Sequence, residues 1–95
     1  MSNEQDKSIP KITPEHVDSK IKSVAYHIFE GTNLTVCCMT LENGFVVTGE
    51  SACVSPKLFD QKIGEELARD VAREKVWMLE GYLLAERLHA SSSDD

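Results

Sequence analysis

Two arginines one helical turn apart are the residues of this sequence whose type and spacing most clearly suggest chemistry. Arg69 and Arg73 lie in the stretch LARDVAREKVW, residues 67–77, whose apolar spacing predicts a helix. Two cations at this spacing repel each other weakly on an isolated helix. Because a guanidinium group can bind a phosphate through two hydrogen bonds, two of them on adjacent turns could clamp one pyrophosphate. The pair is therefore a candidate anion site.

Acidic neighbours on the same helix offer a second interpretation of this pair. Glu65 lies four residues before Arg69, and Glu66 and Asp70 lie three residues before Arg69 and Arg73. Opposite charges at these spacings stabilise exposed helices. The residues alone favour a solvated face of salt bridges, and the phosphate clamp remains open beside it.

The histidines and cysteines do not indicate a metal site or a catalytic centre. The three histidines lack the i,i+4 spacing of a helical metal site, and the three cysteines contain no CxxC pair. Cys53 with His27 would be an imaginable nucleophile and base, but no local pattern supports it. We therefore expect no metal, no cofactor, no catalytic residue and no enzymatic activity, with the cysteines reduced and packed.

Composition narrows the class of protein. The chain has 95 residues, enough for one domain, and a formal net charge of -6, which argues against a general nucleic-acid binder. It has no apolar run long enough to span a membrane and no signal-peptide pattern, so we expect a cytoplasmic protein. A chain this small buries a modest fraction of its surface, and a homo-oligomer is therefore expected.

The pattern along the chain divides it into an arm, a domain and a tail. Residues 1–11 read as a flexible arm, residues 12–90 as a single domain and residues 91–95 as a disordered tail. Thr13 is a good N-cap for a short helix over residues 14–21. The β-branched and aromatic residues of 23–30 then predict a strand.

Asn43-Gly44 lies between two apolar, β-branched runs and predicts a β-hairpin. A two-residue type I′ turn would pair Glu42 with Phe45 and Cys38 with Gly49. Both faces of the hairpin would then be largely apolar. The helices can cover one face, and another subunit could cover the second.

Helical spacing follows the sheet. Ser55 and Pro56 predict a helix start with Asp60 in the first turn, and apolar residues recur at helical spacing to Leu88. Gly81 is the expected bend or break. We predict an α+β fold with an antiparallel sheet followed by two C-terminal helices or one kinked helix.

Residues 35–88 also carry a specific resemblance. The motifs LENGF, GESACV, FDQKIGEELARDVAREKVW and LEGYLL resemble a family of small tailed-phage proteins. That family looks like the type-one Thoeris anti-defence proteins, which share an antiparallel sheet followed by C-terminal helices. The resemblance implies a phage protein that acts in the host cytoplasm.

The function implied by the resemblance is a sponge. Thoeris anti-defence proteins of this type bind glycocyclic ADP-ribose between subunits and hold it without cleaving it, so Thoeris or CBASS-type immunity is blocked. Some assemble as hexamers that also bind cyclic trinucleotides at separate sites, so a dimer or a hexamer is implied.

The resemblance also assigns candidate residues. Arg69 and Arg73 match the family's arginine pair on the phosphates, Phe45 is the candidate aromatic against the base, and Ser51 and Ala52 are candidate polar and backbone contacts. Phe45 could instead be a core residue. Lys20 and Lys22 could form a second anion site, or they could be solvated.

Two rival functions use different residues. A protein-binding inhibitor or an assembly component would depend on the exposed sheet face rather than on the arginines. A nucleotide-cleaving enzyme would degrade the ligand that a sponge releases intact.

Overall fold

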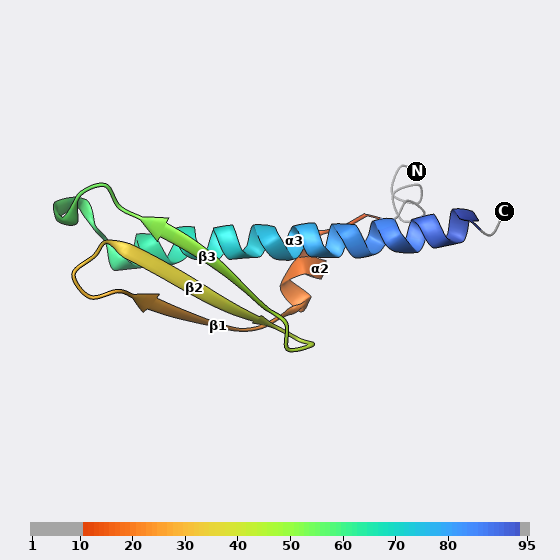
Figure 1. The fold of residues 1–95 in the computed structure, drawn as a ribbon, viewed down its shortest axis with the longest axis horizontal. Helices are drawn as coiled ribbons and strands as arrows, with labels where there is room; N and C mark the ends of the chain where they lie inside the picture. Colours follow the sequence, from red (N-terminus) through yellow and green to blue (C-terminus); the bar gives the residue numbers. More distant parts are fainter. Residues whose placement is uncertain (1–10, 94–95) are drawn as a thin grey trace.

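A computed structural model describes residues 11–93 of the chain (Figure 1). The elements, in chain order, are α2 (Pro14–Ser19), β1 (Ile21–Ile28), β2 (Leu34–Leu41), β3 (Val46–Ala52), the 3₁₀ helix η1 (Pro56–Leu58) and α3 (Gln61–Ser93). The strands form one antiparallel sheet in the order β1-β2-β3. The predicted α+β class with an antiparallel sheet is confirmed. The predicted arm lies outside the described residues except for Lys11.

The short helix α2 begins where its capping residues predict. The Thr13 hydroxyl accepts a hydrogen bond from the His16 amide at 3.1 Å, which satisfies one of the otherwise unpaired N-H groups of the first turn. Val17 is fully buried against the core. The helix ends at Ser19, and β1 starts at Ile21, two residues earlier than predicted, with an irregular register between Ile21 and Ser23.

The hairpin forms at Asn43-Gly44 as predicted, but its turn is one residue longer. Gly44 has a φ of 91°, whereas Asn43 does not adopt a positive φ, so the turn is not type I′. The Leu41 amide donates to the Phe45 carbonyl at 2.8 Å, and the Phe45 amide donates to Asn43 Oδ1 at 3.0 Å. Three residues therefore form the loop, with a left-handed glycine at its end.

The longer turn shifts the register by one residue. Gly49 pairs with Cys37 rather than Cys38, and Val47 pairs with Met39. Since side chains alternate across a strand, this shift exchanges the two faces of β2 relative to β3. Cys37 and Met39 are buried on the side of α3, whereas Cys38 is exposed on the other face.

The core lies between this face of the sheet and α3. The helix contributes Ala68, Ala72 and Val76, which are fully buried. A Cβ atom at Gly49 would overlap the backbone of Ala68 and Ala72, so β3 and α3 meet at backbone distance there. Small residues on both elements are what allow this close approach.

The long helix begins later than predicted and does not break. Ser55 caps only η1, whereas Asp60 Oδ1 accepts hydrogen bonds from the amides of Lys62 and Ile63 at 3.0 and 3.2 Å and caps α3. The helix is continuous through Gly81, so there is one C-terminal helix rather than two. It also continues to Ser93, three residues into the predicted tail, of which residues 94 and 95 lie outside the described residues.

Candidate functional site

The arginine pair lies on the flank of α3 that faces α2. Arg73 Nε donates a hydrogen bond to Asp18 Oδ1 at 2.8 Å, and its Nη2 donates to the Pro14 carbonyl at 3.3 Å. The guanidinium carbon lies 5.8 Å from the centre of the Trp77 ring, within the range of a cation-π interaction. Arg73 is therefore held in one orientation by three contacts.

Both arginines affect the pKa of Asp18. The hydrogen bond from Arg73 lowers the pKa of the Asp18 carboxyl below its usual range, and the charges of Arg73 and Arg69 act in the same direction. The same hydrogen bond raises the pKa of Arg73. The main acidic partner of Arg73 is thus a residue of α2, 55 positions away in sequence, rather than a neighbour on its own helix.

A tyrosine from the sheet completes this flank. Tyr26 lies on β1 opposite Cys37, on the face of the sheet that packs against α3. Burial raises the pKa of the Tyr26 hydroxyl, and the positive charge of Arg69 opposes the increase. Tyr26, Arg69, Arg73, Asp18 and Trp77 are named here the arginine flank. It combines the two cations of α3 with the Trp77 ring under Arg73 and with a sheet tyrosine whose pKa responds to the charge of Arg69.

Phe45 is not part of the arginine flank. It lies just before β3 and lines shallow hollows with residues of both β3 and the later turns of α3, among them Val47, Leu79 and Tyr82. Its side chain is exposed. Within one chain, therefore, Phe45 lines different hollows from the arginine pair, and Tyr26 is the sheet aromatic whose pKa responds to Arg69. The assignment of Phe45 to the base of a nucleotide stays a prediction.

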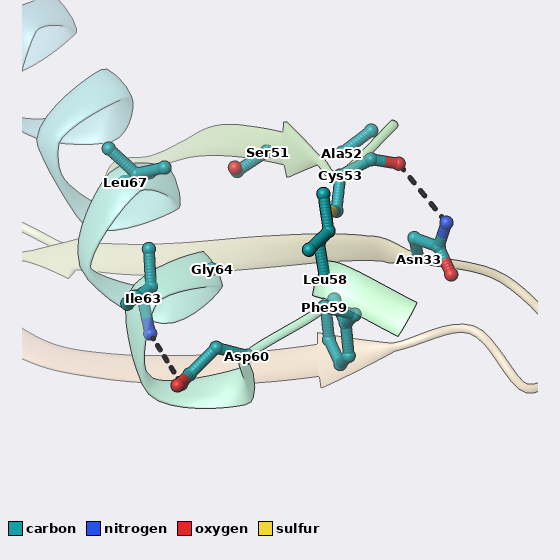
Figure 2. A pocket seen from close by; sticks show the side chains of 10 residues that line it. All are labelled: Asn33, Ser51, Ala52, Cys53, Leu58, Phe59, Asp60, Ile63, Gly64 and Leu67. Atoms are coloured by element: carbon teal, nitrogen blue, oxygen red, sulfur yellow. Dashed lines mark hydrogen bonds between the residues drawn. The ribbon is translucent and has the colours of Figure 1, made fainter. Parts of the chain in front are cut away.

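Ser51 and Ala52 lie in a separate pocket at the start of α3 (Figure 2). This pocket has a volume of about 120 Å³ and is lined by residues of β3, η1 and α3, including Cys53 and Gly64. Two of its polar side chains are engaged, since Asn33 Nδ2 donates to the Cys53 carbonyl at 3.1 Å and Asp60 Oδ1 caps α3. The pocket is small for a dinucleotide, because ligand pockets of proteins usually measure about 300 Å³ or more.

Lys20 and Lys22 also have different surroundings. Lys20 lines a cleft of about 220 Å³ with His16, Glu80 and Arg87, among other residues. In this cleft His16 Nε2 lies 2.7 Å from Glu80 Oε1, and Glu80 is only 8% exposed. Lys22 lies at the irregularity of β1 and does not line the cleft. The cleft therefore combines cations with carboxylates, which weakens it as an anion site.

The thiols and imidazoles are dispersed over the described part of the chain. Among residues 11–93 no three His, Cys, Asp or Glu side chains come together in a group that could hold a metal ion. All three cysteines are free; Cys37 is buried, Cys38 is exposed and Cys53 is half-buried. The His27 ring contacts Phe29 edge-on at 4.5 Å between centroids. The expectation that all three cysteines are packed is thus met fully only by Cys37.

Sequence reasoning missed Asp18, Tyr26 and Trp77 as members of the arginine flank. Tyr26 and Asp18 stand in the correctly predicted strand and helix, but no local pattern links them to residues some 45 to 55 positions later. Trp77 carries a weak signal, because it follows Arg73 by four residues and so shares its side of a helix. A long-range contact such as Asp18 to Arg73 has no such signature.

The comparisons with known proteins give a family and no close relative. The sequence matches the Phage protein (N4 Gp49/phage Sf6 gene 66) family over residues 12–88, which is most of the chain. No curated protein and no solved structure matches it. Within residues 11–93 no helix combines the length and the apolar character needed to cross a membrane. The chain belongs to the Phage protein (N4 Gp49/phage Sf6 gene 66) family.

Proposed function

We propose that this phage protein is an anti-defence protein that binds a cyclic nucleotide immune signal in the host cytoplasm and sequesters it without cleaving it. The candidate ligands are glycocyclic ADP-ribose and cyclic trinucleotides, so Thoeris or CBASS-type immunity would be blocked. The observation that carries the proposal is the arginine flank, where Arg69 and Arg73 stand one turn apart on α3 and Arg73 lies over the Trp77 ring.

The chemistry of this flank suits a pyrophosphate and a base. Two guanidinium groups one turn apart can share the oxygens of adjacent phosphates through charge-assisted hydrogen bonds. A ring of the flank, Tyr26 or Trp77, offers a face or an edge for a base. The contact between Arg73 and Asp18 holds the guanidinium in place before a ligand arrives, which lowers the entropy cost of binding.

Asp18 has a second consequence for the proposed site. Its carboxylate occupies one edge of the Arg73 guanidinium, so a phosphate must share this group or displace Asp18. The Asp18 side chain is about half exposed and can rotate into solvent when a phosphate replaces it. We therefore expect the Asp18→Asn variant to bind the nucleotide more tightly than the wild type, because a competing negative charge is removed.

Calorimetric titration with glycocyclic ADP-ribose tests the proposal. We expect tight binding by the wild type at about one ligand per subunit, and a loss of about 100-fold or more in affinity for both Arg69→Ala and Arg73→Ala, the scale of a buried hot-spot contact. Arg87→Ala is the matched control, because Arg87 is an exposed arginine of the same helix that lines a different cleft. Silent titrations with glycocyclic ADP-ribose and with a panel of cyclic trinucleotides would reject the proposal.

The fate of the ligand separates a sponge from an enzyme. The protein is incubated with the nucleotide and denatured by heat, and the released ligand is analysed by chromatography. A sponge releases it unchanged. A time-dependent conversion to a linear or smaller product would instead identify a nucleotide-cleaving enzyme.

A protein-binding inhibitor or assembly component is the second candidate function. The observation that favours it is the exposed apolar surface on the opposite flank of α3, which includes Leu67, Met78 and Tyr82. Large exposed apolar patches often mark protein interfaces.

A further inference from the structure

The outer edge of β3 is open in the part of the chain that the structure describes. β3 is an outer strand of the order β1-β2-β3, and no further strand among the described residues pairs with it. The Phe45 carbonyl accepts a hydrogen bond from the Leu41 amide at 2.8 Å, so its backbone faces β2. Because an antiparallel partner bonds every second residue, the N-H and C=O groups of Thr48 and Glu50 point away from β2. The edge therefore presents backbone donors and acceptors to a further strand.

This edge has few of the features that keep edge strands from pairing. Native proteins usually blunt such edges with charged residues, prolines or bulges. Over Val46–Ala52 the only charged residue is Glu50, and there is no proline. The pairing of β3 with β2 is regular over the same range, without a bulge. β3 thus offers an unbroken edge to an incoming strand.

The helix α3 leaves an apolar side next to this edge. It packs against β3 and β2 (Figure 1), and a Cβ atom at Gly49 would lie 3.0 Å from Val71 Cβ. Leu67 and Met78 follow Val71 along the same side of the helix, and these three side chains are between 41% and 71% exposed. A strand added to β3 would lie about 4.8 Å from it, beneath this outer side of α3.

Two hollows lie between β3 and α3, at different points along the strand. The larger has a volume of about 400 Å³ and is lined by Val47 of β3 and by Met78 and Tyr82 of α3, among other residues. The smaller is the pocket of about 120 Å³ that Ser51 and Leu67 line. Since side chains on one face of a strand recur at every second residue, alternate residues of an added strand would point toward the side of α3 where both hollows lie.

These features define the chemistry of the occupant. Open backbone groups along a strand are satisfied by an extended polypeptide, as in the peptide-binding domains that add a strand to a sheet edge. The apolar lining of the larger hollow calls for bulky apolar side chains at alternate positions. Lys75 is the one charged residue that lines this hollow, so an acidic residue in the segment would complement it.

The position of α3 disfavours a second β3 as the added strand. The close approach at Gly49 places the backbone of α3 directly against β3. With Gly49 of a second copy opposite this one, the two α3 helices would run about 5 Å apart, one strand spacing, whereas packed helices lie about 8–10 Å apart. A segment of another protein need not bring a helix to this position.

We propose that the outer edge of β3 and the outer side of α3 form a groove for an extended segment of another protein. The segment adds to the sheet as a fourth strand and directs alternate apolar residues toward α3. The proposal rests on the second candidate function, protein binding, and names the partner's chemistry. It does not depend on Arg69 and Arg73 or on a nucleotide.

Selection on the full chain from a displayed library of random ten-residue peptides tests the groove. We expect the enriched peptides to carry apolar residues at alternate positions with an acidic residue among them. Such a peptide, once bound, should slow hydrogen exchange of the Thr48 and Glu50 amides by about tenfold or more, measured by NMR. The Gly49 amide faces β2 and should change little.

Substitutions in the groove test the contacts separately. Thr48→Pro removes an outward N-H, a change that edge strands tolerate, so circular dichroism should match the wild type while peptide affinity falls about tenfold or more. Thr48→Val keeps the N-H and is the matched control, which should bind as the wild type does. Met78→Glu should also weaken binding by about tenfold, because it puts a carboxylate into the apolar hollow. Met78 is 71% exposed, so this variant should fold normally.

Four results would overturn the proposal. Thr48 and Glu50 amides that are protected in the free chain would show that the edge is already covered, by this chain or by a second copy. Selected peptides that protect neither amide would keep protein binding as a candidate function but reject this groove. The others are a library that yields no peptide, and a folded Thr48→Pro variant with wild-type peptide affinity. Titration of the same variant with nucleotide is a separate measurement, so failure of the groove and failure of the nucleotide proposal are distinguishable.

Discussion

The side chains on the two flanks of α3 differ in whether they find partners within the chain. On the arginine flank, polar groups find partners within the chain, since Arg73 bonds to Asp18 and to the Pro14 carbonyl and lies over Trp77. On the opposite flank, apolar side chains such as Met78 and Tyr82 remain exposed. An ion pair between charged groups exposed to water adds little stability, whereas burial of exposed apolar area is favourable. One flank is thus held by polar contacts within the chain, whereas the other exposes apolar area that burial would stabilise.

The largest effect is expected where the helix that carries both flanks touches the sheet. Gly49→Val should destabilise the fold by about 3 kcal/mol or more, because its side chain would overlap the backbone of Ala68 and Ala72 and must push β3 away from α3. Urea denaturation followed by circular dichroism measures the change.

Gly81→Ala is the control for this substitution. A Cβ at Gly81 meets no atom within 4 Å, and alanine favours the helix interior, so we expect a gain of up to about 1 kcal/mol. A Gly49→Val variant as stable as the wild type would contradict the close approach of β3 to α3.

An intermediate effect is expected from salt, and it should separate charged contacts from apolar packing. The Debye length falls from about 10 Å at 0.1 M salt to about 3 Å at 1 M, so nucleotide affinity at the arginine flank should fall roughly tenfold or more over this range. The fold itself should persist, because burial of the apolar core between α3 and the sheet is not screened by salt.

Calorimetry measures the nucleotide affinity at both salt concentrations, and circular dichroism measures the fold. A nucleotide affinity that is unchanged in about 1 M salt would contradict a charged contact at the arginine flank.

The smallest effect is expected from protonation of Asp18, which should change the stability of the fold only slightly. Because the pKa of Asp18 is lowered in the fold, its contribution is present above the ordinary carboxyl pKa of about 4 and is lost as the pH falls through the lowered value. The carboxyl is exposed to solvent, so the contribution is small.

Thermal unfolding of the wild type and Asp18→Asn over a pH series measures this contribution. The two melting temperatures should differ slightly at pH 7 and converge in acid. A difference that grows as the pH falls would show that Arg73 is not the main partner of Asp18.

Local signals predicted the elements better than their boundaries and pairings. The cap at Thr13 and the hairpin at Asn43-Gly44 were predicted correctly, since each depends on a few adjacent residues. The cap at Ser55 was also real, but it ended in η1, and Asp60 started α3 instead. Two good caps five residues apart cannot be ranked without knowing where the helix packs.

By itself, the sequence determined the kind of each element and the α+β class, because turns, caps and apolar periodicity act over a few residues. The tertiary structure decided the register, in which Gly44 but not Asn43 takes a positive φ and Cys37 rather than Cys38 faces the helix. It also decided that Arg73 meets Asp18 and that Phe45 lies away from the arginine flank. These outcomes depend on contacts between distant segments, which are set by the close packing of α3 on the sheet at Gly49.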